Sequence, residues 1–158
     1  MEKDEYLQNI TEKIPEELVT YGLLFTAANR IQAAGDRIMD ELTLRQQFLL
    51  VLLSLFDDYP PTLQELATVF GSSYQNVKRM AAALEEKDYL RIRKDRADRR
   101  KIRIDLNREK YELMRGERYR TAEAFSEKLY SGISEEEIKT LNAILRKIDD
   151  NLAEMEKD

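Results

Sequence analysis

Apolar residues recur every three to four positions along most of this chain, a spacing that predicts amphipathic helices. The first stripe runs from Pro15, which suits the first turn of a helix, to Leu42. A second helix is expected at residues 43–56, where apolar residues occupy nearly every side and therefore predict a central, buried position. Thr43 and Gln46 have the spacing of a capping box, which opens this second helix.

Two short helices are expected next. Thr62 and Glu65 form a second capping box ahead of the segment LQELATVF, and Gly71 supplies the left-handed conformation that ends this helix. Ser73 then caps a helix expected at residues 74–87. Two helices joined by a short turn that contains glycine are typical of a helix-turn-helix.

The apolar period changes from about 3.6 to 2 after Asp88, and a period of 2 predicts β-strands. Leu90 and Ile92 alternate with arginines, and apolar and charged residues alternate again at 102–106. The loop between these runs, at residues 94–100, is strongly basic. A two-stranded ribbon directly after a helix-turn-helix is interpreted as a wing.

Two further helices complete the pattern. Asn107 is placed to cap a long helix that ends near Tyr130, and Ser134 and Glu137 form a third capping box at the start of the last helix. The predicted fold class is therefore mainly α with a small β-wing. It consists of a winged helix-turn-helix domain with helices on both sides of it.

The chain contains no cysteine and no histidine. Disulfides, thiolate zinc sites and thiol chemistry are thereby excluded, together with the commonest general base and the commonest metal ligand. No pair of carboxylates stands out, so we expect no catalytic residue, no metal site and no cofactor. No apolar run is long enough for a bilayer and the N-terminus lacks a signal-peptide core, which predicts a cytoplasmic protein without membrane contact.

The net charge of −5 argues against nucleic-acid binding, but the distribution of charge along the chain argues for it. Residues 87–103 carry nine basic and three acidic side chains, so this stretch has a charge of +6 and the rest of the chain −11. A basic block in an acidic protein is typical of nucleic-acid binding, because contacts to phosphates dominate affinity. A solvated surface hairpin is the alternative that the charge run alone leaves open.

The helix after Ser73 gives the charge run its context. At 100° per residue Val77, Ala81 and Leu84 form a core stripe with Met80, and the opposite side exposes glutamine, arginine and a small alanine. Glutamine can pair with adenine and arginine with guanine, and the first turns of a recognition helix meet base edges. An ordinary exposed helix of a bundle is the alternative. The candidate recognition-helix residues are Ser73, Tyr74, Gln75, Asn76, Lys78 and Arg79.

Residues 43–106 resemble the MarR family of bacterial regulators (multiple antibiotic resistance regulators). Three motifs carry the resemblance: ELA in the first motif helix, LEEKDYL at the exit of the recognition helix, and Asp98-Arg99-Arg100 at the wing. Each is weak alone, but their order and spacing are specific, whereas the flanking helices match in pattern only. Where many members have Leu-Thr after the second wing strand, this chain has Leu106-Asn107.

The resemblance implies a triangular homodimer in which each chain has three segments. Residues 1–42 and 107–158 would supply the dimerisation helices and 43–106 the DNA-binding domain. The recognition helix would enter the major groove and the wing a neighbouring minor groove. By family pattern Asp98 holds the wing turn and Arg100 inserts into the minor groove, with Arg96 as a competing tip residue.

The remaining contact candidates belong to two groups. The wing candidates are Arg91, Arg93, Lys94, Arg96, Asp98, Arg99, Arg100 and Lys101. The candidates for contacts to the DNA backbone are Thr62, Gln64 and Ser72.

Some members of the family sense peroxide through a cysteine and others sense zinc through histidines, and this chain contains neither residue. The resemblance therefore implies a small phenolic or aromatic effector, the kind of ligand that other members bind. Tyr21, Arg30 and Phe48 are the candidate pocket residues, and membership of the core is the alternative for such a stripe.

The predicted function is a sequence-specific, double-stranded DNA-binding regulator, expected to be a repressor that binds a pseudo-palindromic operator as a homodimer. Three alternatives stay open. They are a winged-helix protein-interaction module, an RNA-binding winged helix, and an enzyme with a carboxylate site.

Overall fold

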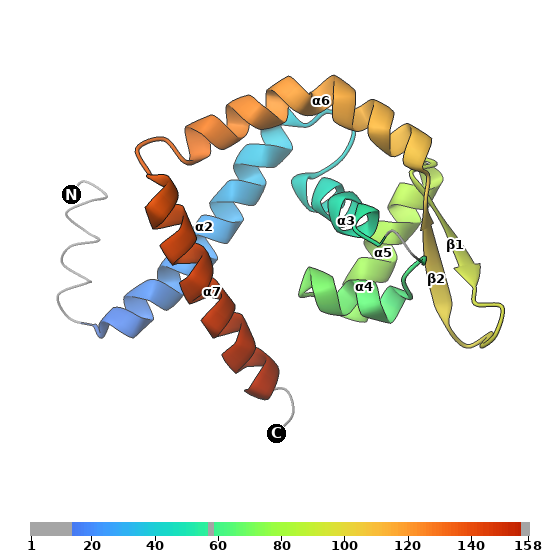
Figure 1. The fold of residues 1–158 in the computed structure, drawn as a ribbon, viewed down its shortest axis with the longest axis horizontal. Helices are drawn as coiled ribbons and strands as arrows, with labels where there is room; N and C mark the ends of the chain where they lie inside the picture. The colour runs from blue at the N-terminus through green and yellow to red at the C-terminus, as the bar shows by residue number, and fades with distance from the viewer. Residues whose placement is uncertain (1–13, 57–58, 156–158) are drawn as a thin grey trace. The chain divides into compact units, whose positions relative to one another are not determined.

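The computed structural model describes residues 14–56 and 59–155, and six helices and two strands follow one another in this part of the chain (Figure 1). This is the predicted mainly α fold with a β-wing. The elements are α2 (Glu16–Ile38), α3 (Leu44–Ser54), α4 (Leu63–Phe70), α5 (Tyr74–Glu86), β1 (Leu90–Lys94), β2 (Ile102–Leu106), α6 (Arg108–Leu129) and α7 (Glu135–Met155). Residues 1–13 of the predicted first segment lie outside the described residues. The chain divides into two units, Met1–Glu117 and Arg118–Asp158.

The starts of the helices lie where the capping boxes predict them. At α4 the backbone N–H of Thr62 donates to Glu65 over 2.7 Å, and the backbone N–H of Glu65 donates to the Thr62 hydroxyl over 3.2 Å. Reciprocal pairs of the same kind open α3 at Thr43 and α7 at Ser134. Gly71 ends α4 with a φ of 65°, the left-handed conformation that the sequence predicts there.

The end of α2 differs from the prediction. The apolar stripe extends to Leu42, but α2 ends at Ile38 and Met39 is extended. Leu42 still reaches the core, where it is 2% exposed, because the chain turns toward α3 instead of continuing the helix. The carboxylate of Asp36 accepts the backbone N–H of Leu44 over 2.7 Å and fixes this turn.

The core of the first unit lies between α3, α4, α5 and the sheet. Sixteen buried apolar residues form one cluster, and Leu49, Leu50, Leu66, Val77, Ala81, Leu84, Leu90 and Ile104 are fully buried in it. The first turns of α6 close the cluster with Tyr111 and Met114. The prediction that α3 is buried on all sides is wrong in part, since Phe48, Val51 and Leu55 are 42–69% exposed on its other face.

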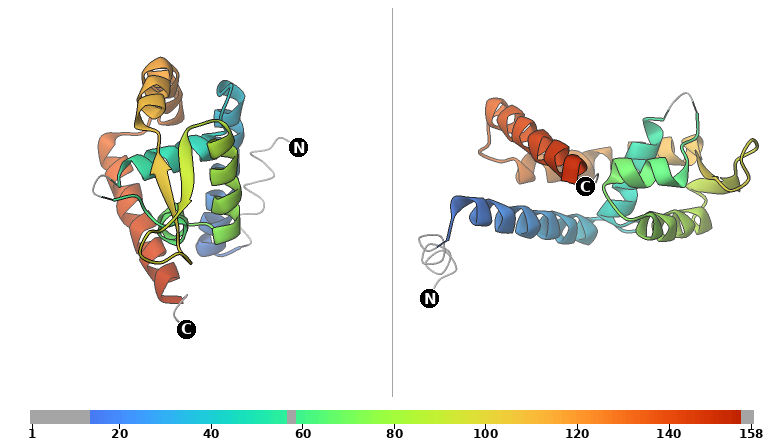
Figure 2. Two further views of the ribbon diagram at one scale, coloured as in Figure 1. Left: turned by 90° about the vertical axis from the view of Figure 1, so that its right-hand side faces the viewer. Right: turned by 90° about the horizontal axis from the view of Figure 1, so that it is seen from below.

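The wing is the predicted antiparallel ribbon, and its two strands lie side by side at the front of the left view of Figure 2. Its register pairs Leu90 with Leu106 and Ile92 with Ile104. The outer side of β2 is tied to the segment that leads into α4, because the backbone N–H of Ile104 donates to the carbonyl of Pro61 over 3.0 Å. The wing is therefore held against the body of the first unit by its second strand.

Beyond Glu117 the end of α6 leads through Gly132, with a φ of 80°, into α7. The apolar side of α7 is open to solvent, with Leu141, Ile144 and Leu152 each about half exposed. No helix among the described residues is long and apolar enough to cross a membrane.

Candidate nucleic-acid interface

Helix α5 presents the face that the helical spacing predicts. Val77, Ala81 and Leu84 are fully buried, and this orientation leaves Gln75 and Arg79 exposed on the other side. Lys78 is exposed beside them. The first two turns therefore offer one amide and two cations to a groove, the groups that match base edges and phosphates.

Other predicted residues of this helix hold its start together. The hydroxyl of Ser73 accepts the backbone N–H of Asn76 over 3.2 Å, and the hydroxyl of Ser72 accepts the Asn76 side-chain amide over 2.9 Å. The Asn76 carbonyl oxygen accepts a hydrogen bond from Arg79 over 3.1 Å. Tyr74 packs partly against the core. These residues orient the helix and Arg79, while Gln75 and Lys78 keep their side chains unengaged within the described residues.

The two candidates around α4 differ in the same way. The hydroxyl and the backbone N–H of Thr62 are both used in the capping box, and Thr62 is only 8% exposed. Gln64 is exposed in the first turn of α4. The hydrogen bond that the Glu65 carboxylate accepts from the backbone N–H of Thr62 is the main cause that lowers the pKa of this carboxyl. Thr62 thus builds the helix start, and Gln64 is the residue with a free side chain there.

The tip of the wing is organised by two aspartates. Asp98 accepts hydrogen bonds from the backbone N–H and the guanidinium of Arg100, at 3.1 and 3.2 Å, as expected of the residue that holds the turn. Asp95, which the sequence analysis did not single out, accepts the backbone N–H groups of Ala97 and Asp98, both over 2.8 Å. A hydrogen bond from Arg103 is the main cause that lowers the pKa of Asp95 to about 2.

Arg103 is the second residue that sequence reasoning missed. Besides its ion pair with Asp95, it donates to the backbone carbonyl of Pro60 over 2.6 Å and lies over the ring of Tyr59. The alternation of apolar and charged residues in β2 places Arg103 on the charged face of the ribbon. It does not predict which residues Arg103 contacts. Asp95 and Arg103 are eight residues apart on the two sides of the loop, and their charges alone do not distinguish a buried pair from two surface residues.

Apart from Lys87, which donates to the backbone carbonyl of Glu41, the basic run contains two kinds of cation. Arg93 is paired with Asp105, Arg100 with Asp98 and Arg103 with Asp95. The second kind is exposed and makes no side-chain hydrogen bond or ion pair within the described part of the chain; it comprises Arg91, Lys94, Arg96, Arg99 and Lys101. This second set is the cationic surface that the wing offers to phosphates.

The candidate effector residues Tyr21, Arg30 and Phe48 are exposed within this chain. Tyr21 is 61% exposed and pairs with Phe25 at a ring distance of 4.8 Å, while Phe48 is half exposed against Phe70. Arg30 is exposed on α2. The core alternative for Tyr21 is therefore wrong within this chain, and the pocket remains a prediction.

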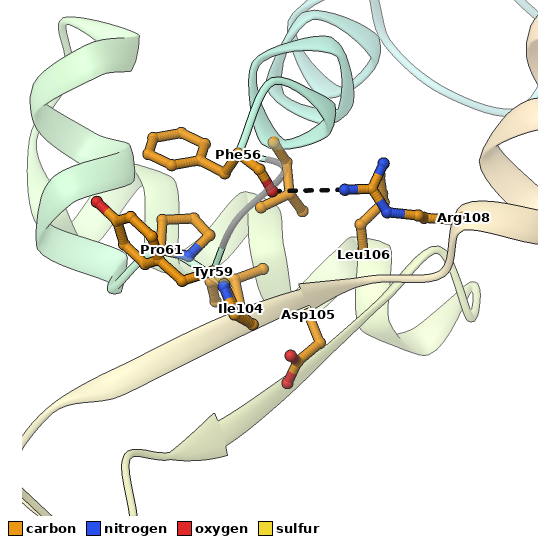
Figure 3. A pocket seen from close by; sticks show the side chains of 9 residues that line it. Phe56, Tyr59, Pro61, Ile104, Asp105, Leu106 and Arg108 are labelled. Atoms are coloured by element: carbon orange, nitrogen blue, oxygen red, sulfur yellow. Dashed lines mark hydrogen bonds between the residues drawn. The ribbon is translucent and has the colours of Figure 1, made fainter. Parts of the chain in front are cut away.

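A small hollow of about 180 Å³ lies instead at the base of the wing (Figure 3). Phe56, Tyr59 and Leu106 line it, and Arg108 points across it to the carbonyl of Phe56 at 3.4 Å. Among residues 14–56 and 59–155 no group of three acidic side chains is placed to hold a metal ion.

Comparison with known proteins identifies the segment that carries this surface. The model of the MarR family matches residues 42–102, which run from just before α3 to the first residue of β2. A search of curated proteins finds no significant match.

Solved structures extend the likeness to most of the chain. Sco3205 from Streptomyces coelicolor, a MarR family transcriptional regulator in complex with DNA, is 21% identical with a TM-score of 0.75, over 89% of this chain and 92% of that one. The S. aureus MepR–DNA complex is 22% identical with a TM-score of 0.70, over 83% and 97%. BpsR from Bordetella bronchiseptica, whose DNA binding is regulated by 6-hydroxynicotinic acid, is 23% identical with a TM-score of 0.69, over 82% and 98%. At these identities the likeness establishes the fold.

Proposed function

We propose that this chain, whose residues 42–102 match the model of the MarR family, is a transcriptional regulator of that family that binds specific sequences of duplex DNA as a homodimer. One observation carries the proposal. Helix α5 exposes Gln75, Lys78 and Arg79 over a buried opposite face, and the adjacent wing exposes cations that form no ion pair with any described residue. A helix that fits a major groove and a basic ribbon beside it are the two parts of a winged-helix DNA reader.

In this proposal α5 lies in the major groove, where Gln75 reads adenine and Arg79 reads guanine. Arg100 enters the neighbouring minor groove. Its side chain is 91% exposed, and its pairing with Asp98 orients it without burying it. Narrow A·T-rich minor grooves attract an inserted arginine. The unpaired wing cations contact the phosphates on either side.

The half-exposed apolar faces of α2 and α7 are the surfaces that we assign to the homodimer. Two-fold symmetry then requires a pseudo-palindromic operator with half-sites about one helical turn apart. We further propose that the protein is a repressor in the cytoplasm and that a small aromatic effector releases it from DNA. The regulation of BpsR by a small aromatic acid supports that class of effector.

The experiment is selection of the purified protein on a random duplex pool, repeated over a range of salt concentrations. Recovery of an inverted repeat, with affinity that falls steeply as salt rises, is the expected result. Absence of any enriched sequence, with weak binding that salt does not affect, would refute the proposal and favour a protein partner for the basic ribbon.

A further inference from the structure

Arg103 joins the two sides of the wing, through its ion pair with Asp95, to a segment much earlier in the sequence. Asp95 lies where β1 runs into the wing tip, and Arg103 lies in β2. The same guanidinium reaches Pro60, 43 residues earlier, in the segment that leads into α4. One side chain thus joins the tip of the wing to the body of the domain.

The hydrogen bonds on both sides of this ion pair connect it to the backbone of the wing. Asp95 holds the backbone N–H groups of Ala97 and Asp98, and therefore fixes the conformation of the tip that carries Arg96 and Arg100. Next to Arg103, the backbone bond from Ile104 to Pro61 pins β2 to the same segment. The position of the tip relative to α4 and α5 depends on these contacts.

The surroundings of Arg103 also argue against a direct contact with DNA. Its side chain is 23% exposed and that of Asp95 is 11% exposed, whereas that of Arg100 is 91% exposed. The guanidinium already donates to a carboxylate and a carbonyl, and its plane lies over the Tyr59 ring at 5.9 Å. Its charge is matched by that of Asp95.

We propose that Asp95 and Arg103 are positioning residues that hold the wing tip in the place required for DNA binding, and that neither touches DNA. This inference rests on the proposed function, since it assigns a role within that DNA site. It makes Asp95 favourable for DNA binding although it is an acid within the basic run.

The sign of the effect of Asp95→Asn separates positioning from electrostatics. Removing an acid beside DNA strengthens binding if charge alone matters. The positioning role predicts the opposite, a loss of affinity of about tenfold, the scale of one or two phosphate contacts. Asp105→Asn is the matched control, because it removes an acid from the same ribbon whose partner, Arg93, is not tied to the α4 segment in the described structure. We expect Asp105→Asn to bind as tightly as the wild type or more tightly.

A double-mutant comparison tests whether Arg103 acts through Asp95. Arg103→Met keeps an aliphatic side chain against Tyr59 but removes both hydrogen bonds. If the two residues act as one unit, Asp95→Asn combined with Arg103→Met binds about as weakly as either single variant. Multiplication of the two losses would overturn the inference and make Arg103 an independent DNA contact, as would tighter binding by Asp95→Asn.

Amide hydrogen exchange without DNA tests the same clamp independently of the proposed function. In the full-length wild type the amides of Ala97 and Asp98 should be protected, and both Asp95→Asn and Arg103→Met should increase their exchange while the core of α5 stays protected. Unchanged exchange at these two amides would overturn the inference. If the wild type selected no duplex but the variants did loosen the tip, the clamp would be real and the proposed function wrong.

Discussion

Individual side chains in the basic run differ more than their charges suggest. Asp105 lies opposite Arg91 in the strand register, but its carboxylate forms its ion pair with Arg93, two residues further along β1. The sequence identified the run and the face of α5 correctly, because both depend on local spacing. The sequence did not distinguish the anchored Arg103 from the exposed Lys101. The partner of Arg103 lies 43 residues earlier, and their contact depends on how the segment before α4 packs against β2.

The carboxylate of Asp95 predicts a specific pH dependence. Its pKa in the folded protein is about 2 and its ordinary value is 3.8, so the folded state binds this proton less readily than the unfolded state. Its contribution to stability is therefore complete above about pH 4 and is lost as the pH falls toward 2. We expect the difference in unfolding free energy between wild type and Asp95→Asn to be constant near neutral pH and to shrink as the pH falls from about 4 to 2. Urea unfolding of both proteins over a pH series measures it, and a difference that is as large at pH 2 as at pH 7 contradicts this account.

Gln75→Ala should relax sequence specificity at one base pair of each half-site. The lost discrimination should be about 1–3 kcal/mol, the value of one bidentate base contact. Competition binding with operators changed at single positions measures the effect. Glu86→Ala, near the C-terminal end of the same helix, is the control and should keep the wild-type base preference. Identical base preferences in Gln75→Ala and wild type would remove Gln75 from the site.

Arg100→Ala should weaken binding most on operators whose minor groove beside the half-site is A·T-rich. Affinities for A·T-rich and G·C-rich flanks, measured at one salt concentration, test the prediction. Arg96→Ala is the comparison, because Arg96 lies in the same loop without a side-chain hydrogen bond or ion pair in the described structure. Loss of the flank preference in Arg96→Ala alone would transfer the minor-groove contact to Arg96.

At the scale of elements, the starts of helices were more predictable than their ends. Thr43, Thr62 and Ser134 each use partners within three residues, so a four-residue pattern contains the whole interaction. The end of α2 depends on the contact of Asp36 with Leu44 and on a close approach at Gly35, where an added Cβ would lie 2.6 Å from Leu44. Those contacts involve another helix, so the apolar period up to Leu42 does not predict them.

Thr62→Ala should destabilise the protein more than Thr43→Ala, although both remove the same type of cap. Loss of a cap costs about 0.5–2 kcal/mol, and Thr62 should lie at the upper end because it is buried and lies beside β2. Denaturant unfolding gives the two values, and Thr62→Ser should restore most of the loss. Equal costs at both positions would show that the contact of Thr62 with the wing adds nothing.

At the scale of the whole molecule, each unit leaves apolar surface open. Leu18, Tyr21 and Phe25 on α2 are more than half exposed, and α7 has a similar stripe. The sequence predicted these stripes and assigned them to dimerisation through the family resemblance. In the proposed homodimer a second copy of the chain covers them.

Ile144→Glu should shift the protein from dimer to monomer, since it places a charge in the middle of the apolar side of α7. Analytical ultracentrifugation measures the change, and the variant should also lose its preference for two half-sites over one. Asn142→Glu adds the same charge about 160° around the helix and should leave the dimer intact. A dimeric Ile144→Glu protein would place the interface elsewhere.

The anchoring of the wing to the segment before α4 also has a consequence for how the chain is made. The cap of α4 needs partners three residues apart, whereas the anchor joins residues separated by 43 positions, and the entropy of closing a loop grows with its length. As the chain leaves the ribosome, the start of α4 can form before residues 102–106 exist. A nascent chain stopped before β2 would therefore contain the proposed recognition helix without the anchor of its wing.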